Sequence, residues 1–537
     1  MTRPGRIVAV LAIVVTPRVA WAQHEHAEQL GHVTFPTSCN AAAQGAFEHA
    51  MALLHSFWWE ESQGAFQAVL AADSSCAMGQ WGLALTAWGN PFAGGPPQTS
   101  ESMRRGAAAA ARAAQLGAPT QREQGFLAAA AALYRDYPTV PNPVRLRAYS
   151  DTLARLYRDF PTDAEIAIAY ALSLVETAPK TDTTFARQKR AAAILNPLFV
   201  RFPDHPGLAH YIIHANDSPA LAPLGLDAAR RYAQIAPAAP HAQHMPSHIF
   251  IRLGLWDETI AANQRAFDAG FNYATAHHTG VAPEQLHALD YMVYADLQEG
   301  RDRDARRVVD RALALQTVLT NDAVVANYNR VAMEARLSLE RSDWKAASEL
   351  PVRAGALTIG AALAHFARGI GAARLGDTAA ARAAIAGLAD VERDMTQRGD
   401  NDWARVVSIK RQLVTAWTEF AAGDTSSALR DCRAAADLED VTEKQPITPG
   451  ELLPARELLG DMLLEARRYA DARAAYTASL ARERRRARSL YGAGRAAELA
   501  GDTAAAHASY TDYVKQLAAG DGDRAELTRV KAALAGH

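Results

Sequence analysis

The pattern of apolar and polar positions is typical of helices along the whole chain. Ala, Leu, Arg and Glu dominate long segments broken by Gly-Asp, Pro and Asn, whereas the alternation typical of strands is almost absent. Near the N-terminus, this pattern predicts helices over 47–57, 60–70 and 76–88, and clusters of Pro and Gly predict loops over 90–100 and 137–143. The predicted fold class is therefore all-α.

A repeat near the C-terminus predicts the architecture. Three residues recur after a shift of 34 positions, with Gly460, Ala472 and Tyr476 followed by Gly494, Ala506 and Tyr510. This shift is the period of the tetratricopeptide repeat (TPR). Its small residues let two paired helices approach, and the aromatic ring fills the gap between them. We therefore predict a TPR-like solenoid, a superhelix of helix-turn-helix units that bury their apolar faces against one another.

Gly-Asp-Thr turns mark the start of further second helices, with Thr378, Thr425 and Thr503 as predicted N-caps. In the middle of the chain such turn markers lie mostly more than about 40 residues apart, longer than the repeat period, so irregular repeats are expected there. We predict one continuous superhelix, with an N-terminal region over 23–300 and C-terminal repeats over 301–537.

The first 22 residues have the parts of a secretion signal. Arg3 and Arg6 supply positive charge, Ile7 to Val15 form a short apolar run, and Ala20-Trp21-Ala22 fits the small-residue cleavage pattern. The mature chain is expected to begin near Gln23. No later stretch approaches the roughly 20 consecutive apolar residues that a membrane helix needs. The sequence therefore predicts a periplasmic or secreted protein without a membrane span.

Charge and cysteine content narrow the class of protein further. The net charge of the 537-residue chain is −2, which argues against nucleic acid as a partner. The basic run over 482–488 is interpreted as a solvated helix face. Cys39 and Cys76 flank the first helix pair and can form one disulfide, which leaves Cys432 as a buried thiol on an Ala-rich helix.

Histidines are concentrated in one part of the chain, since nine of the 17 lie between His205 and His287. His210 and His214 are four residues apart. On a helix their imidazoles project from one face about one turn apart, a spacing that suits two ligands of one metal ion.

A second group, His241, His244 and His248, follows in steps of three and four residues. If its helix begins at Pro240, Pro246 lies inside the helix, removes a hydrogen bond and introduces a kink. Irregularities of this kind are expected at functional or strained sites.

A third group places His287 between two carboxylates, Glu284 and Asp290, each three residues away. His287 with one carboxylate can complete a metal site that uses the earlier histidines. Alternatively, a carboxylate orients an imidazole or acts as a general base, which makes Glu284 and Asp290 the candidate catalytic residues.

Several histidines have a simpler interpretation. Hydrogen bonds alone can hold a polar histidine core, although each unmet nitrogen then costs about 1 to 3 kcal/mol. His205, in a turn, and His277 and His278, in a loop, are interpreted as surface residues. His55 lies beside several aromatic residues and is a candidate pocket residue.

Several stretches resemble a family of exported bacterial TPR proteins of unsettled function, namely 53–61, 76–84, HYIIHA over 210–215, HMPSHIF over 244–250 and LHALDY over 286–291. The resemblance implies export and fold rather than a reaction. Its histidine motifs match five residues that become the preferred metal ligands, His210, His214, His244, His248 and His287. Where Asp-Pro commonly closes the first repeat of the family, this chain has Asp73-Ser74.

We therefore predict an exported solenoid that binds a divalent transition metal, zinc, copper or iron, because imidazoles suit these ions better than magnesium or calcium. With an open coordination position, such a site is expected to support hydrolytic or oxidative catalysis. The alternative is a protein-interaction scaffold with a structural histidine core and a small molecule or peptide on the concave face. A third interpretation, a metal-free pocket for an apolar or aromatic ligand, rests on Trp58, Trp59, Trp81 and Tyr211.

Overall fold

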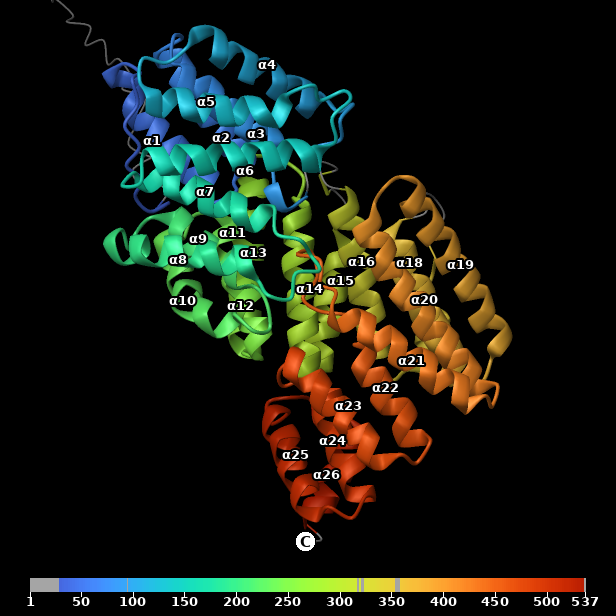
Figure 1. The fold of residues 1–537 in the computed structure, drawn as a ribbon. Helices are drawn as coiled ribbons and strands as arrows, with labels where there is room; N and C mark the ends of the chain where they lie inside the picture. The colour runs from blue at the N-terminus through green and yellow to red at the C-terminus, as the bar shows by residue number, and fades with distance from the viewer. Residues whose placement is uncertain (1–28, 94, 316–317, 320–322, 353–357, 536–537) are drawn as a thin grey trace, which may run out of the picture.

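The structure is a computed structural model that describes residues 29–93, 95–315, 318–319, 323–352 and 358–535 (Figure 1). The predicted leader over 1–22 lies outside the described residues. Within them the chain forms helices and no strand, and an isolated bridge pairs Val281 with Val318. No helix in this part of the chain is both long and apolar enough to cross a membrane. The fold is all-α, as predicted.

The N-terminal half is a stack of antiparallel helices in chain order. They are α1 (Ala41–His55), α2 (Trp59–Ala72), α3 (Ala77–Trp88), α4 (Glu101–Leu116), α5 (Gln121–Tyr134), α6 (Asn142–Asp159), α7 (Ala164–Glu176), α8 (Ala186–Arg201), α9 (Pro206–Asn216) and α10 (Leu226–Ile235), with short 3-10 helices η1 (Pro91–Ala93) and η2 (Ala222–Gly225). Successive helices pack together, and α1 also packs on α3, α3 on α5 and α7 on α9. This stacking is that of a TPR-like solenoid.

The middle of the chain is irregular, as the spacing of the turn markers predicts. It comprises α11 (Pro240–His244), α12 (Pro246–Leu253), α13 (Trp256–Ala276), α14 (Pro283–Gln298), α15 (Asp302–Ala314), α16 (Ala323–Leu339) and α17 (Trp344–Ser348). The prediction that Pro246 lies inside a helix is wrong, because the helix that begins at Pro240 ends before it and Pro246 opens α12. Proline suits this first position, since the N–H it lacks has no partner there.

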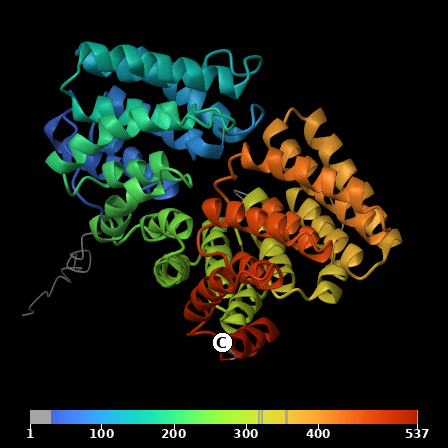
Figure 2. The same cartoon turned by 60° about the horizontal axis from the view of Figure 1, so that its bottom comes forward.

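The C-terminal half continues the solenoid with α18 (Ile359–Arg374), α19 (Thr378–Gln397), α20 (Asn401–Ala421), α21 (Thr425–Asp440), α22 (Ala455–Glu465), α23 (Tyr469–Arg482), α24 (Ala487–Leu499), α25 (Thr503–Gln516) and α26 (Ala525–Ala535). Its last helices curl back beside α14 and α15 (Figure 2). The Gln516 side chain donates to the carbonyl of Gln298, and Gln298 Oε1 accepts from the Ala487 N–H. Helix α14 thus lies where the two halves meet.

Buried apolar residues form several clusters along this superhelix. One runs from Leu30 to Ala262 and another from Tyr328 to Ala496, with a smaller cluster around α14 between them. The division of the chain near residue 300 stays a prediction.

The residues of the 34-residue repeat pack as the pattern predicts. A Cβ placed on Gly460 would lie 2.7 Å from the ring of Tyr476, and one on Gly494 would lie 2.5 Å from the ring of Tyr510. The aromatic ring therefore occupies the space that the glycine leaves open.

The predicted caps are wrong by one residue. The N-caps are the preceding aspartates Asp377, Asp424 and Asp502, whose carboxylates accept from backbone N–H groups inside α19, α21 and α25. Aspartate is an equally good N-cap, and its charge also suits the positive end of the helix dipole.

Replacement of Gly460 by Ala tests this packing. Because the new methyl group would overlap the buried Tyr476 ring, we expect Gly460→Ala to lower the free energy of unfolding by about 1 to 3 kcal/mol. Gly64→Ala, on α2 with open space at its Cβ, is the matched control and is expected to raise stability by about 0.5 to 1 kcal/mol. Urea unfolding measures both, and equal effects of the two substitutions would contradict the packing.

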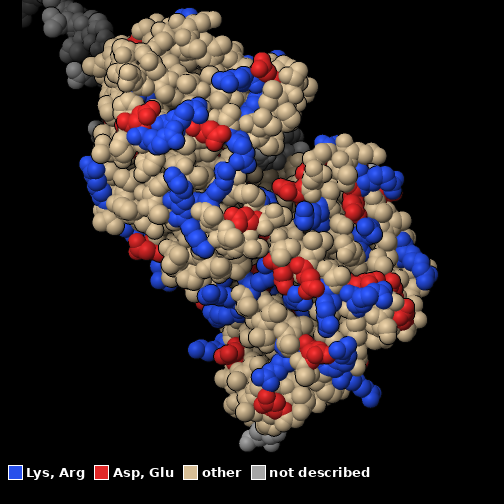
Figure 3. Space-filling view, in the orientation of Figure 1, with Lys and Arg blue, Asp and Glu red and all other residues tan. Residues whose placement is uncertain are grey.

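The structure confirms the predicted disulfide but not the interpretation of the basic run over 482–488. Cys39 and Cys76 form a disulfide, and Cys432 is a buried free thiol. The basic run, however, is not a solvated face throughout, because Arg486 is fully buried between Glu340 and Glu457. On the face shown in Figure 3, basic and acidic side chains are mixed over both halves.

Candidate metal centre

The helices that carry the clustered histidines all begin with a proline. Pro206, Pro240, Pro246 and Pro283 occupy the first turns of α9, α11, α12 and α14. His210, His244 and His287 each follow such a proline by four residues. Since proline fixes φ and favours the first helical position, it sets where each helix starts and therefore where the histidine one turn later projects.

Six of the histidines form two groups of three. Centre A is His210, His214 and His241, and centre B is His244, His248 and His287, and in each centre one nitrogen per ring lies within 4.8 Å of the other two. The centres are adjacent, with ring centroids 6.3 Å apart for His214 and His248. Four helices thus bring together imidazoles that are far apart in the sequence.

In centre B, the hydrogen bonds fix which nitrogen of each ring carries the proton. The Nδ1 atoms face oxygen acceptors, namely Asn263 Oδ1 at 2.6 Å from His244, Asp217 Oδ2 at 2.9 Å from His248, and the Ile447 carbonyl at 3.0 Å from His287. Asn263 presents its oxygen because its amide group donates to the Thr259 carbonyl. Each Nδ1 must therefore donate, and a neutral imidazole that donates through Nδ1 has a bare lone pair on Nε2.

These bare Nε2 atoms converge. The Nε2 atoms of His244 and His248 are 3.0 Å apart, a distance at which two lone pairs repel unless a cation or a proton lies between them. Tetrahedral zinc with Zn–N bonds of about 2.0 to 2.1 Å separates its nitrogen ligands by about 3.3 Å. The arrangement is therefore close to that of a ligand set.

Burial keeps these rings neutral. It lowers the pKa of His244 to about 3 and that of His287 well below its usual value. It also lowers the pKa of His248, although the hydrogen bond to Asp217 opposes this effect. Neutral imidazole is the form that binds metals, so the centre does not lose its ligands to protonation near neutral pH.

Centre A has a similar geometry with fewer fixed protons. His210 Nδ1 donates to the His55 carbonyl at 2.7 Å, so its Nε2 is bare. The Nε2 atoms of His214 and His241 lie 3.1 and 3.2 Å from it. One lone pair can accept only one of these two neighbours, whereas a metal ion would bind all three.

Aromatic rings pack against both centres. Phe57 packs against His210 with centroids 4.4 Å apart and stacks on His241, and Phe92 stacks on His214 at 4.1 Å. Tyr291 contacts all three rings of centre B. These contacts restrict the rotation of the imidazoles.

The loop between α21 and α22, residues 441–454, reaches back to centre B. Besides the Ile447 carbonyl that His287 uses, it brings Lys444 to within 3.5 Å of Asp217. Burial alone would raise the pKa of Asp217, but Lys444 and Arg252 lower it well below its usual value. Asp217 is therefore an ionised acceptor that orients His248.

A third group, His55, Glu165 and His205, also has metal-ligand spacing but a different proton balance. Glu165 accepts from both rings, at 3.2 Å from His55 Nε2 and 2.9 Å from His205 Nε2. His55 Nδ1 in turn accepts from the Tyr211 hydroxyl. Hydrogen bonds therefore satisfy this group without an ion, except at His205 Nδ1, which has no partner in the described part of the chain.

The five preferred ligands all lie in these two centres. Centre A also contains His241, which the sequence places in the second histidine group but which was not one of the preferred ligands. The carboxylates lie elsewhere. Asp290 is fully buried in an ion pair with Arg336 at 2.8 Å, and Glu284 is exposed on the first turn of α14. Neither is part of the three groups of potential metal ligands among the described residues.

The surface interpretation of His205 is wrong, because His205 is buried and paired with Glu165. His277 and His278 are exposed, as predicted. Glu165, Asp217 and Asn263 were not among the site residues predicted from the sequence. Of these, Asp217 had a usable signal, since it lies three residues after His214, whereas the other two lie on helices without a histidine motif.

Comparison with known proteins adds little. No protein-family model and no curated protein sequence matches this chain. Among solved structures, human IFIT1 with PPP-AAAA is similar over 77% of this chain and 86% of its own, at 12% identity and a TM-score of 0.36. Yeast Tom70 is similar over 92% and 96%, at 10% identity and a TM-score of 0.34. Likenesses this weak support no inference about function.

Proposed function

We propose that this protein is an exported metal-binding protein that holds two transition-metal ions, one in centre A and one in centre B. The observation that carries the proposal is which nitrogen of each imidazole in centre B holds the proton. All three Nδ1 atoms donate to oxygens outside the centre, so three bare Nε2 atoms meet inside it. Outer oxygen partners of this kind are typical of metal-ligating histidines.

The ligand chemistry favours zinc, copper or iron, because neutral imidazole suits these ions and carboxylate-rich sites suit magnesium or calcium. Three protein ligands leave a fourth tetrahedral position for water or a substrate atom, as in catalytic rather than structural zinc sites. Such an open position supports metal-dependent hydrolysis or oxidation, so the protein would be an enzyme of one of these two classes.

Export is part of the proposal. The leader pattern over 1–22 supports it, and so does the Cys39–Cys76 disulfide, since disulfides persist mainly in oxidising compartments. The resemblance of the histidine stretches to exported bacterial TPR proteins is consistent with the same location.

A protein-interaction scaffold is the competing function, because helical repeats of this kind commonly bind peptides on a concave face. In a scaffold the six imidazoles would be structural. The cost would be a close contact between two bare nitrogens in centre B, which a purely structural core has no reason to retain.

Metal analysis separates the two functions. The mature protein is purified from Gln23 onward without a histidine tag, and its bound metals are measured by mass spectrometry before and after titration with zinc, copper and iron. We expect two equivalents in the unaltered protein and none held tightly by the His210→Ala/His244→Ala variant. The control, His277→Ala/His278→Ala, removes two exposed imidazoles and should keep both ions. An unaltered protein that takes up none of the three metals would overturn the proposal.

A further inference from the structure

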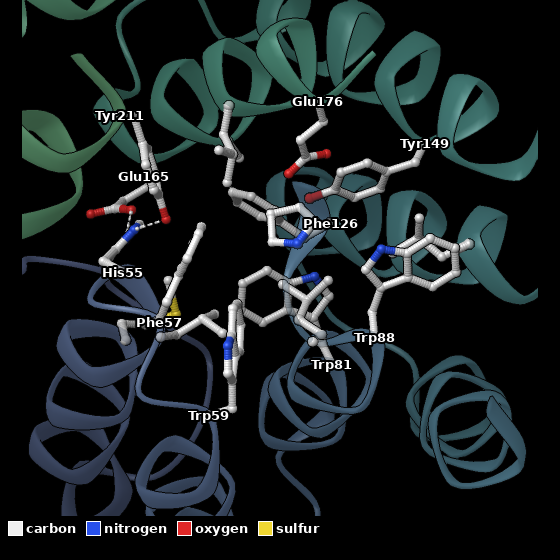
Figure 4. Close-up of a pocket in the computed structure, with 18 of the residues that line it drawn as sticks. His55, Phe57, Trp59, Trp81, Trp88, Phe126, Tyr149, Glu165, Glu176 and Tyr211 are labelled. Atoms are coloured by element: carbon white, nitrogen blue, oxygen red, sulfur yellow. Dashed lines mark hydrogen bonds and ion pairs between the residues drawn. The ribbon is translucent and has the colours of Figure 1, made fainter. Parts of the chain in front are cut away.

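A cavity beside centre A has aromatic walls. It lies among α1, α3, α5, α6 and α7 and has about 70 Å³ of free space and an open mouth. Figure 4 shows its walls, formed mainly by Phe57, Trp59, Trp81, Trp88, Phe126 and Tyr149. Ligand pockets for small molecules are mostly apolar, with a few polar groups that fix the orientation of the ligand. The cavity therefore has the lining of a small-molecule site.

Phe57 contacts both this cavity and centre A. Phe57 lines the cavity, and its ring also packs against His210, His214 and His241. Its backbone has a positive φ of 54°, which costs energy for a bulky residue with a Cβ. Strained conformations of this kind persist where the surrounding structure holds them, often at functional sites.

The ionisable side chains in the cavity wall are acidic or neutral. Glu165 and Glu176 line it, and none of the described lining residues is Lys or Arg. The two histidines that donate to Glu165 already satisfy it. Glu176 differs, because its Oε2 is buried and has no hydrogen-bond partner among the described residues. Figure 4 shows this carboxyl group directed into the cavity beside Tyr149.

A buried carboxyl oxygen without a hydrogen-bond partner, among aromatic rings, matches one class of ligand. Aromatic faces carry negative electrostatic potential and attract organic cations, most strongly when water is excluded. A carboxylate supplies the opposite charge and accepts hydrogen bonds from an ammonium group. We propose that this cavity binds a small organic amine with an aromatic or apolar body, whose ammonium group pairs with Glu176.

The protonation of Glu176 agrees with this assignment. Burial raises the pKa of Glu176 to about 8, as expected for a carboxyl group that lacks a cation in the free protein. Two cations lie near the aromatic walls, and both have other partners. Arg122 lies 5.2 Å over the Phe126 ring and pairs with Asp163, and Arg145 lies 5.5 Å over the Trp88 ring and donates through its Nε to the Val140 carbonyl. A bound amine would supply the missing counter-charge.

Two ligands of the same shape test the proposal. Binding of 2-phenylethylamine and of neutral 2-phenylethanol to the full mature protein is measured by calorimetry at pH 7. We expect the amine to bind at least about 10-fold more tightly than the alcohol. Glu176→Gln should remove this preference, whereas Glu101→Gln, which changes an exposed carboxylate on α4, should retain it.

Two further measurements test whether the ligands bind in this cavity and not at a metal ion. Ala169→Leu places a larger side chain in the cavity wall and should weaken both ligands. The titrations are repeated with a chelator, because amines can also bind metal ions. None of the groups invoked here is a metal ligand, so the amine preference should survive the chelator even if the protein holds no metal. Equal binding of the two ligands, no binding of either, a preference that Glu176→Gln retains, or binding abolished by the chelator would overturn the proposal.

Discussion

A His248→Ala variant is expected to bind one metal ion per chain, where the unaltered protein binds two. The substitution removes one of the three imidazoles of centre B and leaves the ligands of centre A in place. Loss of an outer partner alone commonly costs 10-fold to 100-fold in metal affinity, so loss of a ligand should cost at least about 100-fold at centre B. Mass spectrometry of the purified protein and competition with a chromophoric chelator measure the number of ions and their affinities.

The corresponding variant of centre A, His214→Ala, tests whether the two centres bind metal independently. His214→Ala should empty centre A and spare centre B, because His214 belongs only to the first group. His278→Ala, which changes an exposed imidazole, should keep both ions. If His214→Ala and His248→Ala each lost both ions, the six histidines would form one shared site rather than two. If neither variant lost an ion, neither centre would be a metal site.

Replacement of Asp290 by Ala is expected to lower the free energy of unfolding by about 3 to 5 kcal/mol, the usual cost of leaving one member of a buried ion pair without its partner. The guanidinium group of Arg336 lies 2.8 Å from Asp290, and both side chains are fully buried. Arg336 also donates to the carbonyl of Gly450, so the pair connects α14 and α16 to the loop that covers centre B. Urea unfolding measures the loss.

The same variant separates a structural role of Asp290 from a catalytic one. Because Asp290 contacts Arg336 and is in neither centre, metal stoichiometry should stay at two wherever the variant remains folded. Asp304→Ala, which removes the partner of an exposed arginine on α15, is the control and should change stability little. A stable Asp290→Ala protein that had lost a metal ion would show that this carboxylate serves the metal centre.

Several features could be predicted because they depend on residues close in the sequence. Helices follow from apolar spacing, and the pairing of Gly460 with Tyr476 follows from a repeat whose two copies lie side by side in the chain. The i, i+4 spacing likewise places His210 and His214 on one face. The N-caps were misassigned because Gly-Asp-Thr contains two good capping residues, and only the backbone decides which of them precedes the first helical turn.

The sequence by itself determined that the chain is a helical repeat and that its histidines are clustered, because both properties are local or compositional. Only the tertiary structure decided which histidines share a centre, since His287 receives its acceptor from Ile447, 160 residues further along the chain. It also decided that His205 pairs with Glu165 and that Asp290 pairs with Arg336. A nitrogen becomes available to a metal only when the other nitrogen of the ring has an acceptor. That acceptor comes from whichever distant segment packs against the ring, and no local pattern specifies it.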